Sequence, residues 1–259
     1  MPAHKIDLWW IPVPDIPVEA LYKSCGDILS PDERNRFESQ RLRKGQLQFL
    51  LTRLSLRYLL SAYQADVQPQ QWRILKSETG RPCVDRIQSL LEFNLTHTGQ
   101  HLLIAFTSAG EPGLDAELSG RSVDAKQVAS RYFSIDESRD ITDTRPDDQN
   151  DLFLRYWTLK EAAVKATGQG LSVALRRFCF SNPTNKTFHF SDTQRMSDDC
   201  REEFKFWSSI QDNVALAICL KRHKNIRAGQ LKIDSKKLLW PTASASGRLS
   251  SLEIEWNET

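Results

Sequence analysis

The chain has 259 residues, of which 40% are hydrophobic and 26% charged, so it can bury a substantial core in one large domain or two of ordinary size. Its formal net charge of +2 provides no global field that would attract nucleic acid or a membrane surface. No window approaches the roughly 18 apolar residues of a membrane span, and no signal-like apolar stretch opens the chain. We therefore expect a cytoplasmic globular protein.

The first half of the chain mixes strands and helices. Residues 5–13 are rich in β-branched and aromatic side chains, which predicts a strand that ends at the prolines after it. Ser30, followed by Pro31 and then Glu33, predicts a capped helix start, and leucines at helical spacing extend a helix to about Tyr63. Short strands are predicted over 71–76, 93–95, 102–106 and 114–117, with turns at 78–82, 96–99 and 111–113.

The second half repeats this order of helices and strands. Its predicted helices are 124–132, 136–142 and 148–167, and its predicted strands lie near 178–180, 188–190, 203–208 and 214–220. The sequence therefore predicts an α+β protein of two comparable units, with residues 1–118 as the N-terminal half and residues 119–225 as the C-terminal half. Residues 226–259 are polar, and we expect them to form an appended, peripheral C-terminal segment.

Two carboxylates stand two residues apart on one predicted strand. Asp115 and Glu117 should point to the same face, because side chains alternate along a strand. Carboxylates that converge repel one another unless a cation lies between them, and magnesium commonly keeps one or two of them beside water and substrate phosphate. The pattern alone is also typical of a solvated strand edge.

Trp157, Glu161 and Lys165 recur at intervals of four on the predicted helix that ends at Gly168, so they share a face. A Glu four residues before a Lys is often only a surface ion pair. The large apolar Trp157 on the same face indicates that the two charges are partly sheltered. Sheltered charges need partners, and a metal and a phosphate are candidates.

A third group of residues favours anion binding. Thr96 and His97 belong to a segment that we predict as a tight turn, where backbone N–H groups and small hydroxyls can point at an anion. Lys76, Gly80 and Arg81 lie on a neighbouring predicted turn and add two cations. A lone histidine is usually structural, and these residues by themselves do not select a substrate.

Together, these segments resemble the 4'-phosphopantetheinyl transferases, specifically the monomeric type that activates surfactin synthetase. The resemblance spans roughly residues 5–225 and rests on ordered motifs. The motifs are Gly80-Arg81-Pro82, Phe93-Asn94-Leu95-Thr96-His97-Thr98, Gly113-Leu114-Asp115-Ala116-Glu117, and Trp157-Thr158-Leu159-Lys160-Glu161-Ala162-Ala163-Val164-Lys165 with the following Gly168 and Gly170-Leu171. The last two motifs are highly specific as a pair.

The resemblance implies a pseudo-dimer of two α+β halves, with coenzyme A and Mg²⁺ bound between them. By position, the implied metal ligands are Asp115 and Glu117 from the first half and Glu161 from the second. The implied coenzyme A contacts, besides Asp115 and Lys165, are Arg36 at the 3'-phosphate, Thr96 and His97 at phosphates, Gly80 and Arg81 at the nucleotide, and Lys76 at a further basic position. Some positions depart from the family pattern: Thr96 replaces the usual Ser, Glu33 stands where relatives often have a base, and Gln48 where many have an arginine.

The implied reaction transfers the phosphopantetheine arm to a serine of an apo acyl, peptidyl or aryl carrier protein and releases adenosine 3',5'-bisphosphate. Lys165 would stabilise or protonate the leaving group. Glu161 would act as the base, directly or through a metal-bound water. We expect a monomer with no nucleic-acid or membrane partner.

Two other interpretations stay open at this point. The basic stretch from Arg34 to Arg57 would suit a non-catalytic module that binds carrier proteins or nucleic acid. Such a binder has no need for Asp115, Glu117 and Glu161 at a phosphate site. A different magnesium-dependent phosphotransferase would normally carry a G-x-x-x-x-G-K-[ST] loop, which the sequence lacks.

Overall fold

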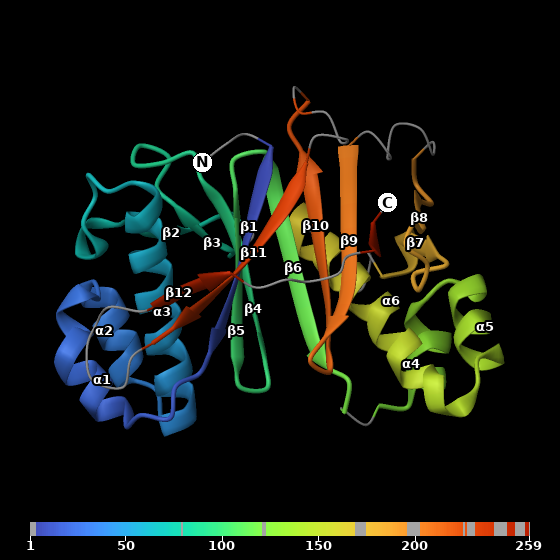
Figure 1. Cartoon of the computed structure of the whole chain (residues 1–259), viewed down its shortest axis with the longest axis horizontal. Coiled ribbons are helices and arrows are strands. Elements are labelled where there is room, and N and C mark those ends of the chain that lie inside the picture. The colour runs from blue at the N-terminus through green and yellow to red at the C-terminus, as the bar shows by residue number, and fades with distance from the viewer. Residues whose placement is uncertain are drawn as a thin grey trace.

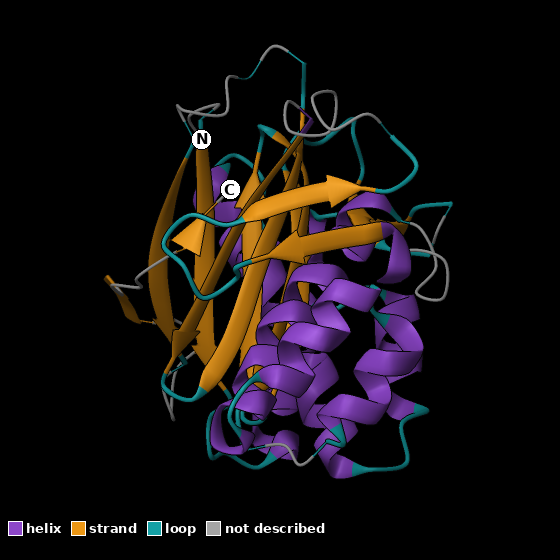
Figure 2. Ribbon diagram, turned by 90° about the vertical axis from the view of Figure 1, so that its right-hand side faces the viewer, coloured by secondary structure: helices purple, strands orange, loops and turns teal. Residues whose placement is uncertain are grey.

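Two β-sheets stand next to each other at the centre of the molecule, and each carries helices on its outer face (Figure 1). The computed structural model describes residues 4–78, 80–120, 123–168, 175–195, 203–224, 226, 231–240, 248–251 and 257–258. The turned view in Figure 2 shows helices packed against the strands. This mixture of helices and strands confirms the predicted α+β class.

The first sheet has the strand order β12-β11-β1-β5-β4, and the second has the order β13-β9-β10-β6. Two short hairpins, β2–β3 and β7–β8, complete the strands. The strands are β1 Lys5–Pro12, β2 Ile74–Lys76, β3 Pro82–Val84, β4 Glu92–Thr98, β5 His101–Thr107, β6 Gly110–Leu118, β7 Phe178–Ser181, β8 His189–Asp192, β9 Phe204–Gln211, β10 Val214–Arg222, β11 Lys232–Leu239, β12 Arg248–Ser251 and β13 Asn257–Glu258. The α-helices are α1 Val18–Cys25, α2 Pro31–Glu38, α3 Arg43–Tyr63, α4 Ala125–Tyr132, α5 Ile135–Asp143 and α6 Pro146–Thr167.

Three hydrophobic clusters hold these layers together. One lies between α1–α3 and the first sheet, one between the two sheets, and one between α4–α6 and the second sheet. Strand β1 shows why both faces of the first sheet are apolar: Trp9 packs toward the helices, whereas Leu8 and Trp10 pack toward the second sheet. Successive side chains of a strand point to opposite faces, so a strand covered on both sides is apolar throughout.

Most predicted elements are confirmed, but the predicted turns at 96–99 and 111–113 are wrong, the second because strand β6 already begins at Gly110. Strand β4 runs through Thr98, with His97 opposite Leu102 of β5, and only Gly99 and Gln100 form the turn. The β-branched Thr96 and Thr98 are buried, and such residues fit a pleated, covered strand. His97 and Thr96 therefore lie on a strand, and the expected nest of turn amides does not form at these two residues.

The two halves contain matching buried ion pairs. In the first half, Ser30 and Glu33 form the predicted capping box of α2, and Arg57 of α3 lies 2.6 Å from Glu33 Oε2. In the second half, Ser134 and Glu137 form a capping box on α5, and Lys160 of α6 is 2.8 Å from Glu137 Oε2. Each cation comes from the long helix of its half.

The resemblance between the two networks extends to their other contacts. Arg57 also donates to the carbonyl oxygens of Pro69 and Trp72, just before hairpin β2–β3. Lys160 donates to those of Leu175 and Phe178, the latter at the start of hairpin β7–β8. Such repetition supports the expected relation between two similar halves.

The C-terminal region differs from the expected peripheral segment in the part that the structure describes. Strand β11 lies in the first sheet, parallel to β1, with Lys232 opposite Lys5. Trp240 is buried against α3, and its indole Nε1–H donates to Ser55 Oγ of that helix at 2.9 Å. The apolar side chains of this C-terminal region, and not its polar average composition, determine where it packs.

Strand β6 lies in the second sheet, paired with β10, although the expected boundary assigns residues 110–118 to the first half. A strand's sheet depends on its pairing partners and not on its position in the chain. Within the described residues, no helix is long and apolar enough to cross a membrane.

Candidate functional site

The candidate site lies where the edge strands of the two sheets meet. Strand β4 borders the first sheet and β6 borders the second. They are joined by a hydrogen bond from the Leu114 backbone N–H to Asn94 Oδ1, 3.2 Å long. This junction brings Thr96 and His97 of β4 to the carboxylates Asp115 and Glu117 of β6, which the sequence separates by about twenty residues.

Helix α6 completes the site because it approaches β6 very closely. A Cβ atom added at Gly113 would lie only 1.9 Å from the carbonyl oxygen of Ala162, so the contact requires the absence of a side chain. The approach places the helix face that bears Glu161 and Lys165 against β6. The glycine of the Gly113–Glu117 motif thus has a packing role.

Lys165 makes the most direct link between helix and strand. Its ammonium donates to Asp115 Oδ1 at 2.7 Å, to the Leu114 carbonyl oxygen at 2.9 Å and to Thr96 Oγ1 at 3.3 Å. The Thr96 hydroxyl in turn donates to Asp115 Oδ1 at 3.3 Å. Asp115 and Thr96 are buried, whereas Lys165 is partly exposed, so the ammonium borders solvent.

The carboxylates of the site are strongly coupled. The pKa of Glu161 is raised to about 7, mainly by burial and further by the negative charges of Asp115 and Glu117, against the opposing effect of Lys165. The second carboxylate oxygen of Asp115, Oδ2, is buried and has no hydrogen-bond partner among the described residues. Acidic oxygens crowded in this way favour the arrival of positive charge.

The donor set fits a hard divalent cation, but it is not a closed cage. Among the described residues, no three His, Cys, Asp or Glu side chains stand close enough to form a ready metal centre. Asp115, Glu117 and Glu161 supply carboxylate oxygens, and the buried Oδ2 of Asp115 has no hydrogen-bond partner among the described residues. Mg²⁺ typically takes only one or two protein carboxylates and fills its shell with water and substrate phosphate, so an open set of this chemistry suits it.

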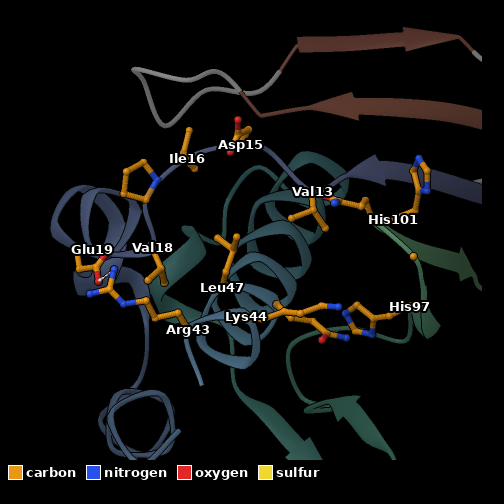
Figure 3. Close-up of a pocket in the computed structure, with 14 residues that line it drawn as sticks. Val13, Asp15, Ile16, Val18, Glu19, Arg43, Lys44, Leu47, His97 and His101 are labelled. Atoms are coloured by element: carbon orange, nitrogen blue, oxygen red, sulfur yellow. Dashed lines mark ion pairs between the residues drawn. The ribbon is translucent and has the colours of Figure 1, made fainter. Parts of the chain in front are cut away.

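His97 connects the site to two cavities. It lines a cavity of about 770 Å³ together with Glu117, and a second of about 710 Å³ together with Lys44 and Gln48 of α3. Figure 3 shows the second cavity, with His97 at one end and Arg43 paired with Glu19 at the other. Burial lowers the pKa of His97 to about 4, with a smaller contribution from Lys165, so the ring is neutral near pH 7.

Arg81 lies at the other end of β4. Its guanidinium donates to the carbonyl oxygens of Phe93 at 2.5 Å and Lys165 at 3.5 Å, so it ties β4 to the end of α6. Gly80 has a φ of +80°, and Lys76 is exposed at the end of β2. These three residues flank the site on the β2–β3 turn, and within the described part of the chain none of them forms a hydrogen bond or ion pair with Asp115 or Glu161.

Arg36 belongs to a separate basic surface. Its guanidinium lies 5.7 Å from the Phe49 ring centroid, and that of Arg53 lies 5.4 Å from the same ring. Glu33, the departure noted in the sequence, points inward to Arg57 and Arg53. Its acidic side chain is therefore a structural partner of two arginines.

Two residues of the site have no signal in the sequence. Thr52 of α3 lies 2.8 Å from His97 Nε2 although 45 residues separate them. The backbone carbonyl of Leu114 receives the Lys165 ammonium. Neither contact follows from residue type or spacing, because both depend on how elements that are distant in the chain pack together.

Comparisons with known proteins agree on one family. Residues 111–219 match the model of the 4'-phosphopantetheinyl transferase superfamily. The 4'-phosphopantetheinyl transferase HetI of Nostoc sp. is 33% identical over 173 residues, which cover 66% of this chain and 71% of HetI. A Synechocystis sp. protein provisionally assigned the same activity is 33% identical over 169 residues, 65% of this chain and 67% of its own length. The 4'-phosphopantetheinyl transferase Sfp of Bacillus subtilis is 30% identical over 152 residues, 58% and 65% of the two chains.

Proposed function

Since this chain belongs to the 4'-phosphopantetheinyl transferase superfamily, we propose that it uses Mg²⁺ to move the phosphopantetheine arm of coenzyme A onto a serine of an apo acyl, peptidyl or aryl carrier protein. The products are a holo carrier protein and adenosine 3',5'-bisphosphate. The observation that carries the proposal is the meeting of Asp115, Glu161 and Lys165 where the two sheets join. The matched part of the chain, 111–219, contains all three.

Asp115, Glu117 and Glu161 would hold the metal. When bound, Mg²⁺ supplies positive charge that neutralises the pyrophosphate. The unsatisfied Asp115 Oδ2 supports this assignment, and so does the raised pKa of Glu161, which results first from burial and then from the charges of Asp115 and Glu117. Both features describe acidic oxygens that the Lys165 ammonium compensates only in part.

Lys165 would stabilise the leaving group. The attack of the carrier serine on phosphorus breaks the phosphoanhydride bond, and negative charge accumulates on the departing bisphosphate. The Lys165 ammonium already borders solvent and donates hydrogen bonds to Asp115 Oδ1, Thr96 Oγ1 and the Leu114 carbonyl oxygen. An incoming phosphate oxygen can replace one of these acceptors. A preorganised charge of this kind acts mainly on the transition state.

Glu161 would take the proton of the carrier serine, directly or through a water. A carboxylate with a pKa near 7 is a better proton acceptor than an ordinary glutamate, because the strength of a base rises with its pKa. The carboxylate lies on the face of α6 that also bears Lys165. One helix therefore carries both the base and the cation that stabilises the leaving group.

The remaining contacts to coenzyme A would come from the first half and its hairpin. We assign the nucleotide to Gly80 and Arg81, the 3'-phosphate to Arg36, and phosphates to His97 and Thr96, with Lys76 as a further cation. The exposed cation Arg36 and the half-buried His97 beside two cavities support these assignments. Thr96, being buried, would act through the Lys165 ammonium that it contacts.

The organisation of the chain follows from the same proposal. Residues 1–118 and 119–225 form two related halves with the substrate between them, followed by the segment 226–259, and one chain supplies the whole site. The matching networks of Glu33 with Arg57 and Glu137 with Lys160 support two related halves. We expect a monomer, which sedimentation or light scattering will check.

Intact-mass spectrometry tests the transfer. An apo acyl carrier protein and an apo peptidyl carrier protein are each incubated with the enzyme, coenzyme A and Mg²⁺. We expect one phosphopantetheine mass to be added to at least one of them and the gain to vanish with a chelator. A carrier protein whose serine is replaced by alanine is the matched control and should gain nothing.

Binding without transfer would favour a non-catalytic module. If coenzyme A binds while several apo carriers stay unmodified with Mg²⁺ and with Mn²⁺, the proposal of a transferase fails. The interpretation as a non-catalytic binding module then stands. Nothing in the described site favours nucleic acid, since Asp115, Glu117 and Glu161 would repel a polyphosphate that arrived without a metal.

A further inference from the structure

The side chain of Thr52 in α3 contacts the imidazole ring of His97. The threonine is buried, and its hydroxyl oxygen lies 2.6 Å from the carbonyl oxygen of Gln48, one helical turn earlier. The same oxygen lies 2.8 Å from His97 Nε2. Both distances are those of hydrogen bonds, so a single hydroxyl serves two partners.

The number of protons fixes the direction of both bonds. A hydroxyl has one hydrogen to donate, and a carbonyl oxygen such as that of Gln48 can only accept. The Thr52 proton therefore goes to Gln48, and a lone pair of Thr52 Oγ1 faces the ring. His97 Nε2 must then carry a hydrogen and donate it to Thr52.

The other ring nitrogen is left as an acceptor. Because burial keeps the pKa of His97 at about 4, the ring is neutral at pH 7 and bears one hydrogen only. That hydrogen is on Nε2, so Nδ1 presents a lone pair. Among the described residues, none forms a hydrogen bond with Nδ1, and His97 lines both cavities of the site.

We propose that Thr52 is a positioning residue that holds His97 in the Nε2–H form, with Nδ1 reserved for the ligand. The inference rests on the proposed function, in which His97 contacts a phosphate of coenzyme A. A phosphate oxygen and the Nδ1 lone pair repel each other, so binding requires a proton on Nδ1. The imidazolium then donates Nδ1–H to phosphate and Nε2–H to Thr52, and coenzyme A binding takes up a proton.

Several titratable groups face His97 or line the cavities beside it. They are Lys165 of α6, His101 of β5, Glu117 of β6, Arg43 and Lys44 of α3, Glu19 of α1, and Asp15 before α1. Lys165 opposes protonation, whereas a bound phosphate favours it. All of them remain when Thr52 alone is changed, so a comparison of Thr52 variants isolates its hydroxyl.

The first test reads the tautomer and needs no ligand. Long-range ¹H–¹⁵N NMR of the imidazole is recorded for the wild type, Thr52→Ser and Thr52→Val. We expect the Nε2–H form in the wild type and in Thr52→Ser, which keeps the hydroxyl, and loss of that preference in the isosteric Thr52→Val. An Nδ1–H wild type, or an unchanged tautomer in Thr52→Val, would overturn the proposal.

The second test measures coenzyme A binding by calorimetry in buffers of different ionisation enthalpy. We expect proton uptake by the wild type near pH 7 and an affinity that falls as the pH rises. Thr52→Val should weaken binding by roughly tenfold, since it removes a hydrogen bond to a charged group, and Thr52→Ser should not. Equal binding and equal proton uptake in all three proteins would contradict the proposal.

A double variant separates positioning from packing. In a His97→Ala background, Thr52→Val should have no further effect on coenzyme A affinity, because the partner is gone. An undiminished effect would show that Thr52 acts by packing alone and would overturn the inference. Failure of the wild type to modify any carrier counts against the proposed function instead, because the NMR comparison involves neither coenzyme A nor a carrier.

Discussion

The Lys165 ammonium lies 2.7 Å from Asp115 Oδ1, at a carboxylate that we assign to a metal. In this structure, the Lys165 side chain of α6 supplies the positive charge that balances the Asp115 carboxylate of β6. A divalent cation that reaches Asp115 therefore competes with Lys165, and the two cations must share the carboxylate or one must move. Binding of substrate phosphate offers Lys165 a new partner and so favours the arrival of the metal.

The first prediction concerns catalysis by Lys165. Lys165→Met should lower the rate of transfer by about 10²–10³-fold while the protein keeps its fold, because the lost charge acts on the transition state. Rates come from intact-mass time courses, and circular dichroism checks the fold. Lys126→Met changes an exposed lysine on α4 and serves as the control. Wild-type turnover of Lys165→Met would refute the assigned role.

The second prediction concerns the metal without substrate. Removal of the Lys165 ammonium frees Asp115 Oδ1, so Lys165→Met should bind Mn²⁺ in the absence of coenzyme A more tightly than the wild type, by roughly tenfold. Electron paramagnetic resonance of free Mn²⁺ measures the affinity. Asp115→Asn should weaken it. An identical affinity in the wild type and Lys165→Met would show that ammonium and metal do not compete.

The third prediction concerns pH. The pKa of Glu161 is raised in the folded protein, to about 7 from a usual value of 4.5, so the folded state binds the proton more tightly than the unfolded state. The protonated Glu161 carboxyl therefore contributes its whole stabilisation below the pKa of the unfolded state. This contribution is lost as the pH rises from there toward the folded pKa of about 7. Glu161→Gln, which cannot ionise, should be more stable than the wild type at pH 8 by about 1 kcal/mol, a figure reduced for solvent screening of a half-buried carboxyl.

Urea denaturation at pH 4 and pH 8, without metal, measures this difference. The stability gap between Glu161→Gln and the wild type should be smaller at pH 4, where both side chains are neutral. A gap that is the same at both values would mean that the ionisation of Glu161 does not oppose folding.

The fourth prediction concerns the contact between β6 and α6. Gly113→Ala places a methyl group where the Ala162 carbonyl already lies, so we expect a loss of about 1–3 kcal/mol in unfolding free energy, or more, together with a slower transfer. Gly120→Ala is the matched control, because a Cβ there meets no atom within 4 Å. Guanidinium denaturation compares the two, and equal stabilities would refute the steric argument.

The fifth prediction concerns the buried pair of Lys160 with Glu137. Lys160→Met leaves the Glu137 carboxylate buried without its cation and should cost about 3–5 kcal/mol. The double variant Lys160→Met with Glu137→Gln should recover part of the loss. Arg145→Met breaks an exposed pair with Asp148 and should cost under about 1 kcal/mol. Urea denaturation orders the three, and a small loss in Lys160→Met would refute the argument.

The sequence was most informative where a local rule decides the structure. The capping box of Ser30 and Glu33 is confirmed, as are most of the helices and strands, because caps, turns and periodicity are properties of neighbouring residues. The family was also predictable, since its motifs are contiguous. The roles of Asp115, Glu117 and Glu161 as metal ligands remain predictions.

Features that depend on distant pairing could not be predicted in the same way. The sequence predicts a turn at Thr96 and Thr98, yet pairing with β5 and contact with β6 extend the strand through both residues. The link between Thr52 and His97 requires two elements 45 residues apart to meet. The polar composition of the C-terminal residues concealed Leu238 and Trp240, which pack in the core.

Strand β11 has a consequence for the order of events during synthesis. It is the parallel neighbour of β1, yet more than two hundred residues separate them in the chain. While the ribosome makes the intervening residues, one side of β1 has unpaired backbone groups and the buried Asp7 lacks its partner Lys236. The N-terminal half thus leaves the ribosome first, but its sheet is completed only after β11 has been made. Ribosome-bound chains that end before Lys232 should therefore be more sensitive to protease than the released protein.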